Sequence, residues 1–100
     1  MDYRGEAAEV IEVKVGERFV ISLAARPAAG YTWFEKYDPQ ALEAIRTNDL
    51  RLEGPEPGAG GEEEFEFEAI APGETVIELQ YRREWESTAR ETRTYRVRIV

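Results

Sequence analysis

Between Glu62 and Ala69 the sequence alternates between apolar and acidic residues. Phe65, Phe67 and Ala69 occupy one set of positions, and glutamates occupy the positions between them. Because successive side chains of a β-strand point to opposite faces of a sheet, this two-residue period predicts a strand with one buried face. A cation site is one interpretation of the glutamates, and a solvated outer face is the one that the pattern favours.

The same alternation recurs in other short segments that turn-forming residues separate. Together they predict seven strands, at 10–15, 19–23, 31–37, 50–52, 62–69, 77–81 and 95–99. Asp38-Pro39 followed by Gln-Ala-Leu-Glu-Ala-Ile predicts one short helical turn between the strands at 31–37 and 50–52, because it supplies an N-cap and good helix formers. This pattern indicates an all-β antiparallel sandwich. The expected core includes Ile21, Leu23, Phe65, Phe67, Ile77, Leu79, Val97 and Ile99.

The size and charge of the chain limit its class further. A length of 100 residues, with 42% apolar and 34% charged types, predicts a single domain over residues 1–100. The formal net charge of -8 argues against nucleic acid or a membrane surface as partner. No apolar run approaches the ~18 to 20 residues that span a bilayer, and the N-terminus lacks the apolar core of a signal peptide. A cytoplasmic location and export after removal of a leader both stay open.

The chain contains no histidine and no cysteine. Ser–His and Cys–His nucleophile pairs, disulfides and the commonest zinc ligand are therefore absent. Nothing in the spacing of the glutamates selects two of them as an acid and a base. We expect no enzyme activity, no metal site and no cofactor.

One stretch, Arg-Pro-Ala-Ala-Gly-Tyr-Thr-Trp at 26–33, interrupts the alternation. Pro27 fixes φ near ~-65° and Gly30 permits a positive φ, so the chain is expected to turn here. The Ala-Ala tip and the following tyrosine would present a small apolar surface, which is typical of recognition loops. Trp33 is expected to enter the core.

The parity of the strands brings this loop together with two others. If each strand reverses direction, the loops that follow residues 23, 52 and 81 share one end of the sandwich. They contain Pro-x-x-Gly-Tyr-x-Trp at 27–33, Gly-x-Gly-Gly at 58–61 and Arg-x-Trp at 83–85. In this order and spacing, together with Val-Gly-Glu at 15–17, the motifs resemble those of the chagasin-type inhibitors of cysteine peptidases. The resemblance extends from Ile11 to the last predicted strand.

The resemblance implies an immunoglobulin-like fold and a function without catalysis. A member of this family is a reversible, competitive inhibitor that occludes the active-site cleft of a papain-like cysteine peptidase with these three loops. We expect such a peptidase as the partner of this chain, and the chain itself to be a monomer. The residues that would bind the peptidase are Pro27, Ala28, Ala29, Gly30 and Tyr31 over its catalytic centre, Gly58, Ala59, Gly60 and Gly61 along the cleft, and Arg83 and Trp85 on the other flank.

This sequence departs from the family's usual motifs at Arg26, at the Ala-Ala pair and at Glu84, where the family usually has Asn, Thr-Thr and Pro. A non-inhibitory immunoglobulin-like adhesion or accessory module is therefore the alternative function, since a fold alone does not fix function. Glycoside hydrolysis by a pair of glutamates is a third. For the loops themselves, the alternatives are a flexible connector at 58–61 and a Trp85 folded onto the sheet edge.

Overall fold

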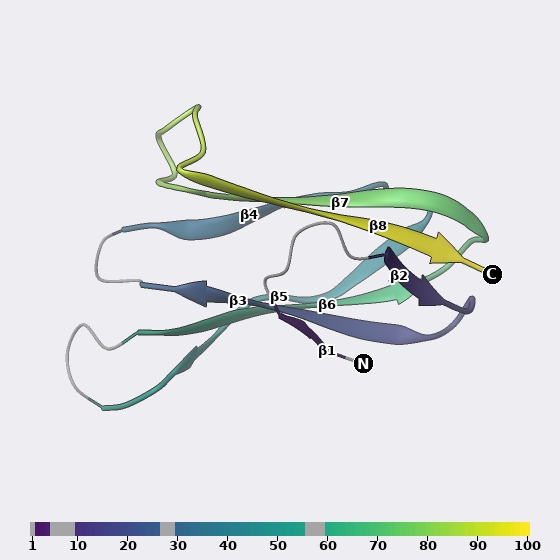
Figure 1. Ribbon diagram of the computed structural model, residues 1–100, viewed down its shortest axis with the longest axis horizontal. Coiled ribbons are helices and arrows are strands. Elements are labelled where there is room, and N and C mark those ends of the chain that lie inside the picture. The colour runs from purple at the N-terminus through teal and green to yellow at the C-terminus, as the bar shows by residue number, and fades with distance from the viewer. Residues whose placement is uncertain (1, 5–9, 27–29, 56–59) are drawn as a thin grey trace.

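The computed structural model describes residues 2–4, 10–26, 30–55 and 60–100. In these residues eight strands form two sheets that pack face to face (Figure 1). The strands are β1 (Asp2–Arg4), β2 (Val10–Val13), β3 (Arg18–Ala25), β4 (Thr32–Lys36), β5 (Leu42–Leu52), β6 (Gly61–Ala69), β7 (Gly73–Arg82) and β8 (Glu91–Ile99). One sheet has the order β1-β3-β6-β5 and the other β2-β8-β7-β4. The predicted all-β sandwich is confirmed, and the short β1 adds a strand to the seven expected.

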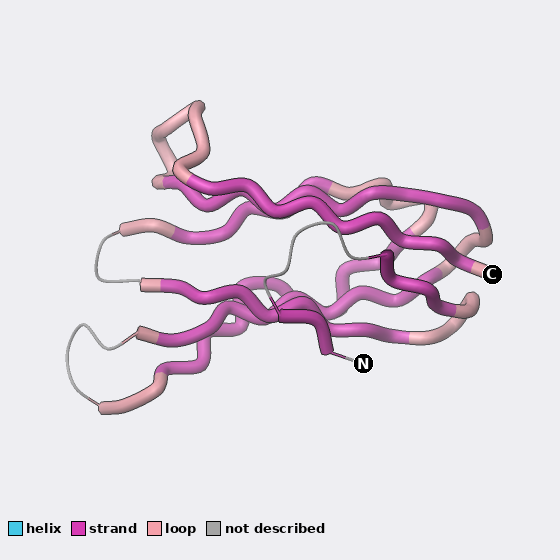
Figure 2. Tube along the Cα trace, viewed as in Figure 1, coloured by secondary structure: helices cyan, strands magenta, loops and turns pink. Residues whose placement is uncertain are grey.

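Most neighbouring strands are antiparallel, as the sequence indicated. Two strands near the N-terminus are the exceptions: β1 runs parallel to β3, and β2 runs parallel to β8. From β3 onward the chain reverses direction at each connection. The β3–β4, β5–β6 and β7–β8 connections therefore lie together at one end of the sandwich (Figure 2).

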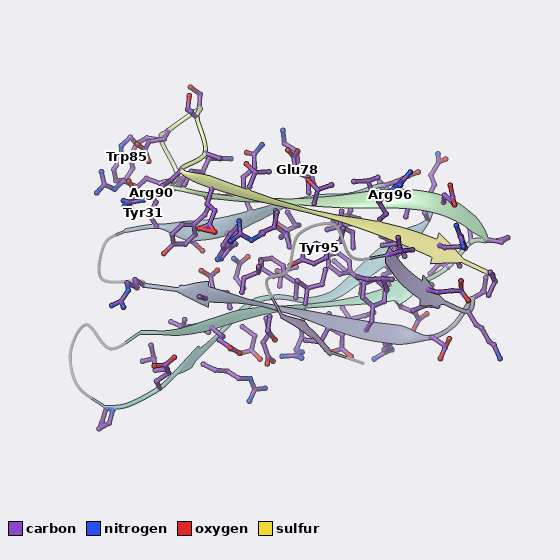
Figure 3. The ribbon with its side chains drawn as sticks, viewed as in Figure 1. Tyr31, Glu78, Trp85, Arg90, Tyr95 and Arg96 are labelled. Atoms are coloured by element: carbon purple, nitrogen blue, oxygen red, sulfur yellow. The ribbon has the colours of Figure 1, made fainter. Side chains whose placement is uncertain are left out.

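The core fills the space between the sheets. All eight residues that the alternation predicted to be buried are buried, and so is Trp33, at 3% exposed. Phe19 and Phe67 stack with ring centres 5.9 Å apart. Tyr95, from β8, lies between the two sheets and is fully buried (Figure 3). The apolar face of each strand thus supplies the contacts that hold the sandwich together.

The helical turn expected after Asp38-Pro39 is not present, and the described residues contain no helix. Asp38 does organise a turn: its carboxylate accepts a hydrogen bond of 2.9 Å from Gln40 N, and its carbonyl oxygen accepts one of 3.0 Å from Leu42 N. The chain then enters β5, where Leu42 pairs with Ala69 and is completely buried. Pairing with β6 and burial of Leu42 outweigh the local helix propensity of this segment. The strand predicted at 50–52 is the end of this long strand.

The strand predicted at 10–15 ends earlier than expected. β2 stops at Val13, and Val15 is 49% exposed instead of facing the core. A tight turn follows, in which Glu17 N donates to Lys14 O at 3.0 Å and Gly16 has a φ of 92°. Because glycine permits this left-handed conformation, the chain turns within the segment that the alternation predicted to be a strand.

Glu64, Glu66 and Glu68 of β6 point outward, as predicted, and arginines pair with them. Arg46 Nε lies 3.0 Å from Glu66, and Arg46 and Arg51 both bond Glu64, at 3.2 and 2.9 Å. Burial alone would raise the pKa of Glu64, but the two guanidinium groups outweigh it and lower the pKa below its ordinary value. In the described residues no group of acidic side chains is placed to hold a metal ion.

No helix long and apolar enough to cross a membrane occurs in the described part of the chain.

Candidate functional site

The three loops that the sequence singled out lie together at one end of the sandwich, opposite the C-terminus (Figures 1 and 2). The ends of β3 and β4 lie between the β7–β8 loop on one side and the ends of β5 and β6 on the other. β3 and β5–β6 belong to one sheet, and β4 and β7–β8 to the other. The β3–β4 loop (residues 26–31) therefore joins the two sheets, and its described ends lie between the β7–β8 loop (83–90) and the described ends of the β5–β6 loop (53–60).

Five of the predicted site residues fall outside the described part of the chain. They are Pro27, Ala28, Ala29, Gly58 and Ala59. The remaining six are Gly30, Tyr31, Gly60, Gly61, Arg83 and Trp85. The geometry of these six, and of the strand ends that carry them, defines the candidate site.

Gly30 ends the β3–β4 loop in a conformation that favours glycine. Its φ is 80°, as the sequence predicted. An added Cβ would have no closer neighbour than Arg83 Nε, at 3.9 Å. Space is therefore available at this position, and the backbone conformation is what makes glycine the favoured residue.

Hydrogen bonds from side chains hold both stems of this loop. The indole Nε1 of Trp33, at the start of β4, donates to the carbonyl oxygen of Ala24 in β3 at 2.9 Å. On the other stem, Arg26 N donates to the hydroxyl oxygen of Tyr81 in β7 at 3.0 Å. Each bond joins the two sheets, so the ends of the loop are fixed relative to both.

A stack of aromatic rings leads from the core to the β7–β8 loop. The ring centre of Tyr81 lies 4.8 Å from that of Trp33 and 5.3 Å from that of Tyr31. The guanidinium groups of Arg83 and Arg90 lie 4.7 and 5.4 Å from the centre of the Tyr31 ring (Figure 3). The structure thus places Tyr31 and Arg83, which the sequence assigned to different loops, in contact. It adds Arg90, which no sequence motif singled out.

Trp85 lies at the outer edge of this stack. It is 77% exposed, and its ring centre is 6.0 Å from the guanidinium of Arg83 (Figure 3). The alternative in which Trp85 folds onto the sheet edge is therefore wrong. An indole this exposed is unusual, since large aromatic side chains are normally buried on average.

The β7–β8 loop that carries Trp85 is braced from within. Arg82 Nη1 donates to the carbonyl oxygens of residues 83, 84 and 86 at 3.2 to 3.3 Å. Its guanidinium also lies 4.0 Å from the ring centre of Phe34 in β4. The amide N of Arg83 donates to the Glu86 carboxylate at 3.1 Å, and that of Arg90 to Tyr81 O at 2.8 Å. Hydrogen bonds to its backbone therefore hold the loop that carries Trp85 in one conformation.

On the opposite flank, the two described glycines differ in their environment. Glu53 N donates to Gly60 O at 2.9 Å and continues the β5–β6 hairpin. A Cβ on Gly61 would lie 2.3 Å from the carbonyl oxygen of Arg51, whereas one on Gly60 would approach nothing closer than 4.0 Å. Gly61 is therefore required by the hairpin itself. Only Gly60 of this pair has space above it for another molecule.

Two exposed leucines next to this hairpin were missed by the sequence analysis. Leu50 and Leu52, at the end of β5, are 40% and 55% exposed. They occupy alternate positions opposite Glu63 and Gly61 and so share one side of the hairpin. Their alternation correctly indicated a strand, and it carries no signal that distinguishes an exposed face from a buried one.

Comparisons with known proteins agree with this architecture. A family model described as chagasin family peptidase inhibitor matches residues 12–99. Among solved structures, a cysteine protease inhibitor from Entamoeba histolytica, EhICP2, is 23% identical, with a TM-score of 0.87 over 99% of this chain and 94% of that one. No curated protein sequence matched the chain.

Two further solved structures share the fold. Amebosin is 23% identical, with a TM-score of 0.69 over 99% of this chain and 96% of that chain. PbICP-C, solved in complex with falcipain-2, is 15% identical, with a TM-score of 0.58 over the whole of this chain and 88% of that chain. At these identities the likenesses establish the fold.

Proposed function

Because this chain belongs to the chagasin family of peptidase inhibitors, we propose that it inhibits papain-like cysteine peptidases reversibly and competitively. The family is one of inhibitors, which confirms the expectation that the chain is not an enzyme. Two of the structures that share its fold are named as a cysteine protease inhibitor and as a complex with falcipain-2. This supports a cysteine peptidase as the target.

The three-loop end supplies the surface for this inhibition. The β3–β4 loop, from Pro27 to Tyr31, covers the catalytic centre of the peptidase. Gly58 to Gly61 lie along one wall of the cleft, and Arg83 and Trp85 contact the other. Glycines allow the backbone to approach an extended groove closely, and Arg and Trp are enriched among the residues that dominate binding energy.

The observation that carries the proposal is the exposure of Trp85 on a braced loop. Burying an indole from water on binding is favourable, and a loop that is already ordered loses little entropy when it binds. Arg83 connects Trp85 to Tyr31 of the central loop. Tyr31 and this flank therefore bind as parts of one ordered surface.

The exposed pair Leu50 and Leu52 extends this surface on the β5–β6 side. Exposed apolar side chains that adjoin a recognition loop are typical of interaction sites. Apart from Trp85, the other large exposed hydrophobic residues in the described part of the chain lie away from the three loops, and Ile70, in the β6–β7 turn at the opposite end, is an example. We assign the two leucines to contacts beyond the cleft wall.

The experiment is a titration of papain and a cathepsin with the purified domain. We expect competitive inhibition at or below micromolar concentration, reversal on dilution, and an uncut domain after long incubation, measured by mass spectrometry. The double variant Leu50→Ser, Leu52→Ser should inhibit more weakly, whereas Ile70→Ser is the matched control at the opposite end. Unchanged activity of every peptidase tested would contradict the proposal and favour the non-inhibitory module.

A further inference from the structure

Glu63 is a buried carboxylate at the base of the β3–β4 loop. It is 4% exposed, although the neighbouring glutamates of β6 point outward. Its Oε1 accepts hydrogen bonds from Thr32 Oγ1 at 2.7 Å, from Asn48 Nδ2 at 2.6 Å and from Trp33 N at 3.4 Å. A glutamate is almost never buried without partners, so these bonds are what make its inward position possible.

Asn48 is held in an unusual backbone conformation to make its bond. Its φ of 52° is the one positive value among the described residues other than glycine. It lies where the pairing of β5 with β6 shifts register, between Arg46 and Asp49. Such irregularities re-aim a side chain, and asparagine tolerates the left-handed region better than most residues. The unfavourable backbone conformation of Asn48 is therefore linked to the direction in which its side-chain amide points.

The amide of Asn48 uses both of its hydrogens at the loop base. Its Nδ2 lies 2.6 Å from Glu63 Oε1 and 2.8 Å from the carbonyl oxygen of Trp33. Asn48 and Glu63 belong to β5 and β6 in one sheet, whereas Thr32 and Trp33 begin β4 in the other. The bonds thus cross between the sheets at the first two residues after the β3–β4 loop.

We propose that Asn48 and Glu63 form a clamp that positions the β3–β4 loop relative to the β5–β6 loop for peptidase binding. This inference rests on the proposed function. The strands that carry Asn48 and Glu63 continue directly into the β5–β6 loop, so the clamp holds two of the three binding loops in one arrangement. The stack of Arg83 on Tyr31 holds the third. A surface ordered in advance binds with a smaller entropy loss.

The clamp opens to solvent on one side, because Asn48 is exposed. An open hollow of about 280 Å³ is lined by Gly30, Tyr31, Thr32, Asn48, Leu50 and Glu63. On this side the exit of the β3–β4 loop faces the hollow instead of the close-packed core. On this side the bond to Glu63 holds the side chain of Thr32, whereas on the other side the backbone of Thr32 pairs with Arg82 of β7. Loss of the clamp bonds should move the loop while the core stays intact.

Three variants of the whole domain test the clamp. Asn48→Gly removes the amide and keeps a residue that tolerates a positive φ, and Glu63→Gln removes the charge that orders the three donors. Glu64→Gln is the matched control, because it makes the same change one residue away on the opposite face. Amide hydrogen exchange of Tyr31 and Thr32 in the free domain is measured beside the dissociation rate of its complex with papain.

In both clamp variants we expect the amide hydrogens of Tyr31 and Thr32 to exchange at least about tenfold faster than in the wild type. The complex of each variant with papain should dissociate about tenfold faster, which is the scale of one hydrogen bond to a charged group. Glu64→Gln should change neither rate. Unchanged exchange in the clamp variants, equal changes in the control, or faster exchange with unaltered dissociation would overturn the proposal. If the wild-type domain inhibits no peptidase, the proposed function fails, and the exchange rates alone decide whether the clamp holds the loop.

Discussion

The indole nitrogen of Trp33 and the carbonyl oxygen of Ala24 lie 2.9 Å apart, and this bond closes the base of the β3–β4 loop. Ala24 precedes the loop and Trp33 follows it, in different sheets. The same tryptophan is buried in the core and stacks on Tyr81. One side chain therefore links the packing of the sandwich to the geometry of its binding loop.

Substitution of Trp33 should separate these two roles. Trp33→Ala removes a buried indole and should lower the free energy of unfolding by about 3 to 5 kcal/mol. Trp33→Phe keeps most of the apolar contact but leaves the Ala24 carbonyl without its donor, which should cost about 1 to 3 kcal/mol. Urea unfolding measures both. Equal losses for the two variants would show that the hydrogen bond, and not the buried ring, is what Trp33 contributes.

The ion pairs on the outer face of β6 should make stability depend on pH. The folded-state pKa of Glu64 is lowered below the ordinary value of 4.5, so its contribution is complete above that value and is lost as the pH falls through the folded-state pKa. Glu64→Gln should therefore be less stable than wild type by about 1 kcal/mol at pH 7, and the difference should shrink by pH 3. A difference that is the same at both pH values would contradict the assignment.

Much of the fold could be predicted from the two-residue alternation, because burial of one strand face repeats at every second position. The predicted helical turn at 40–45 was wrong, because it was based on the local helix preferences of Gln-Ala-Leu-Glu-Ala-Ile. There the decisive contacts are with residues more than twenty positions away, such as the pairing of Leu42 with Ala69. Local propensity carries no information about such a partner.

The candidate site could be predicted in part. Strand parity placed the three loops at one end, and Gly30 has the predicted positive φ. Asn48 and Glu63 were not found, because hydrogen bonds between polar side chains leave no periodic signal in the sequence and their partners come from other strands. Arg90 was missed for the same reason, since its contact with Tyr31 depends on how two loops meet.

The two glycines at the end of the β5–β6 hairpin should differ on substitution. Gly61→Ala places a Cβ 2.3 Å from the Arg51 carbonyl oxygen and should destabilise the domain by about 1 to 3 kcal/mol as the hairpin shifts. Gly60→Ala has space within the domain and should leave the unfolding midpoint unchanged while weakening peptidase inhibition. Melting curves and inhibition constants test the pair. A stable Gly61→Ala would show that the hairpin adjusts freely.

Gly30 can be tested against a glycine with a similar backbone conformation. Gly30 and Gly16 have φ values of 80° and 92°, and Gly16 lies in the β2–β3 turn at the opposite end. An alanine at either position should cost about 1 kcal/mol, the scale of the left-handed penalty. Only Gly30→Ala should weaken inhibition, because only it distorts the β3–β4 loop. If Gly16→Ala weakens inhibition equally, the effect comes from global stability.

The strongest test of the binding surface is Trp85. Its indole is 77% exposed, so Trp85→Ala removes little that the folded domain uses, and the unfolding midpoint should stay within about 2 °C of wild type. Its loss from a peptidase complex should weaken binding by at least about 2 kcal/mol, the scale of an interface hot spot.

Ile70→Ala is the control for Trp85, since it removes an exposed apolar side chain at the end opposite the three loops. It should leave affinity unchanged.

Arg83→Met tests the connection to the central loop: it removes the charge beside Tyr31 and Trp85 and keeps much of the apolar stem. Because both residues are assigned to contacts with the cleft wall, the double variant Arg83→Met, Trp85→Ala should bind more weakly than Trp85→Ala alone. A double variant that binds no more weakly would show that Arg83 acts only by orienting Trp85.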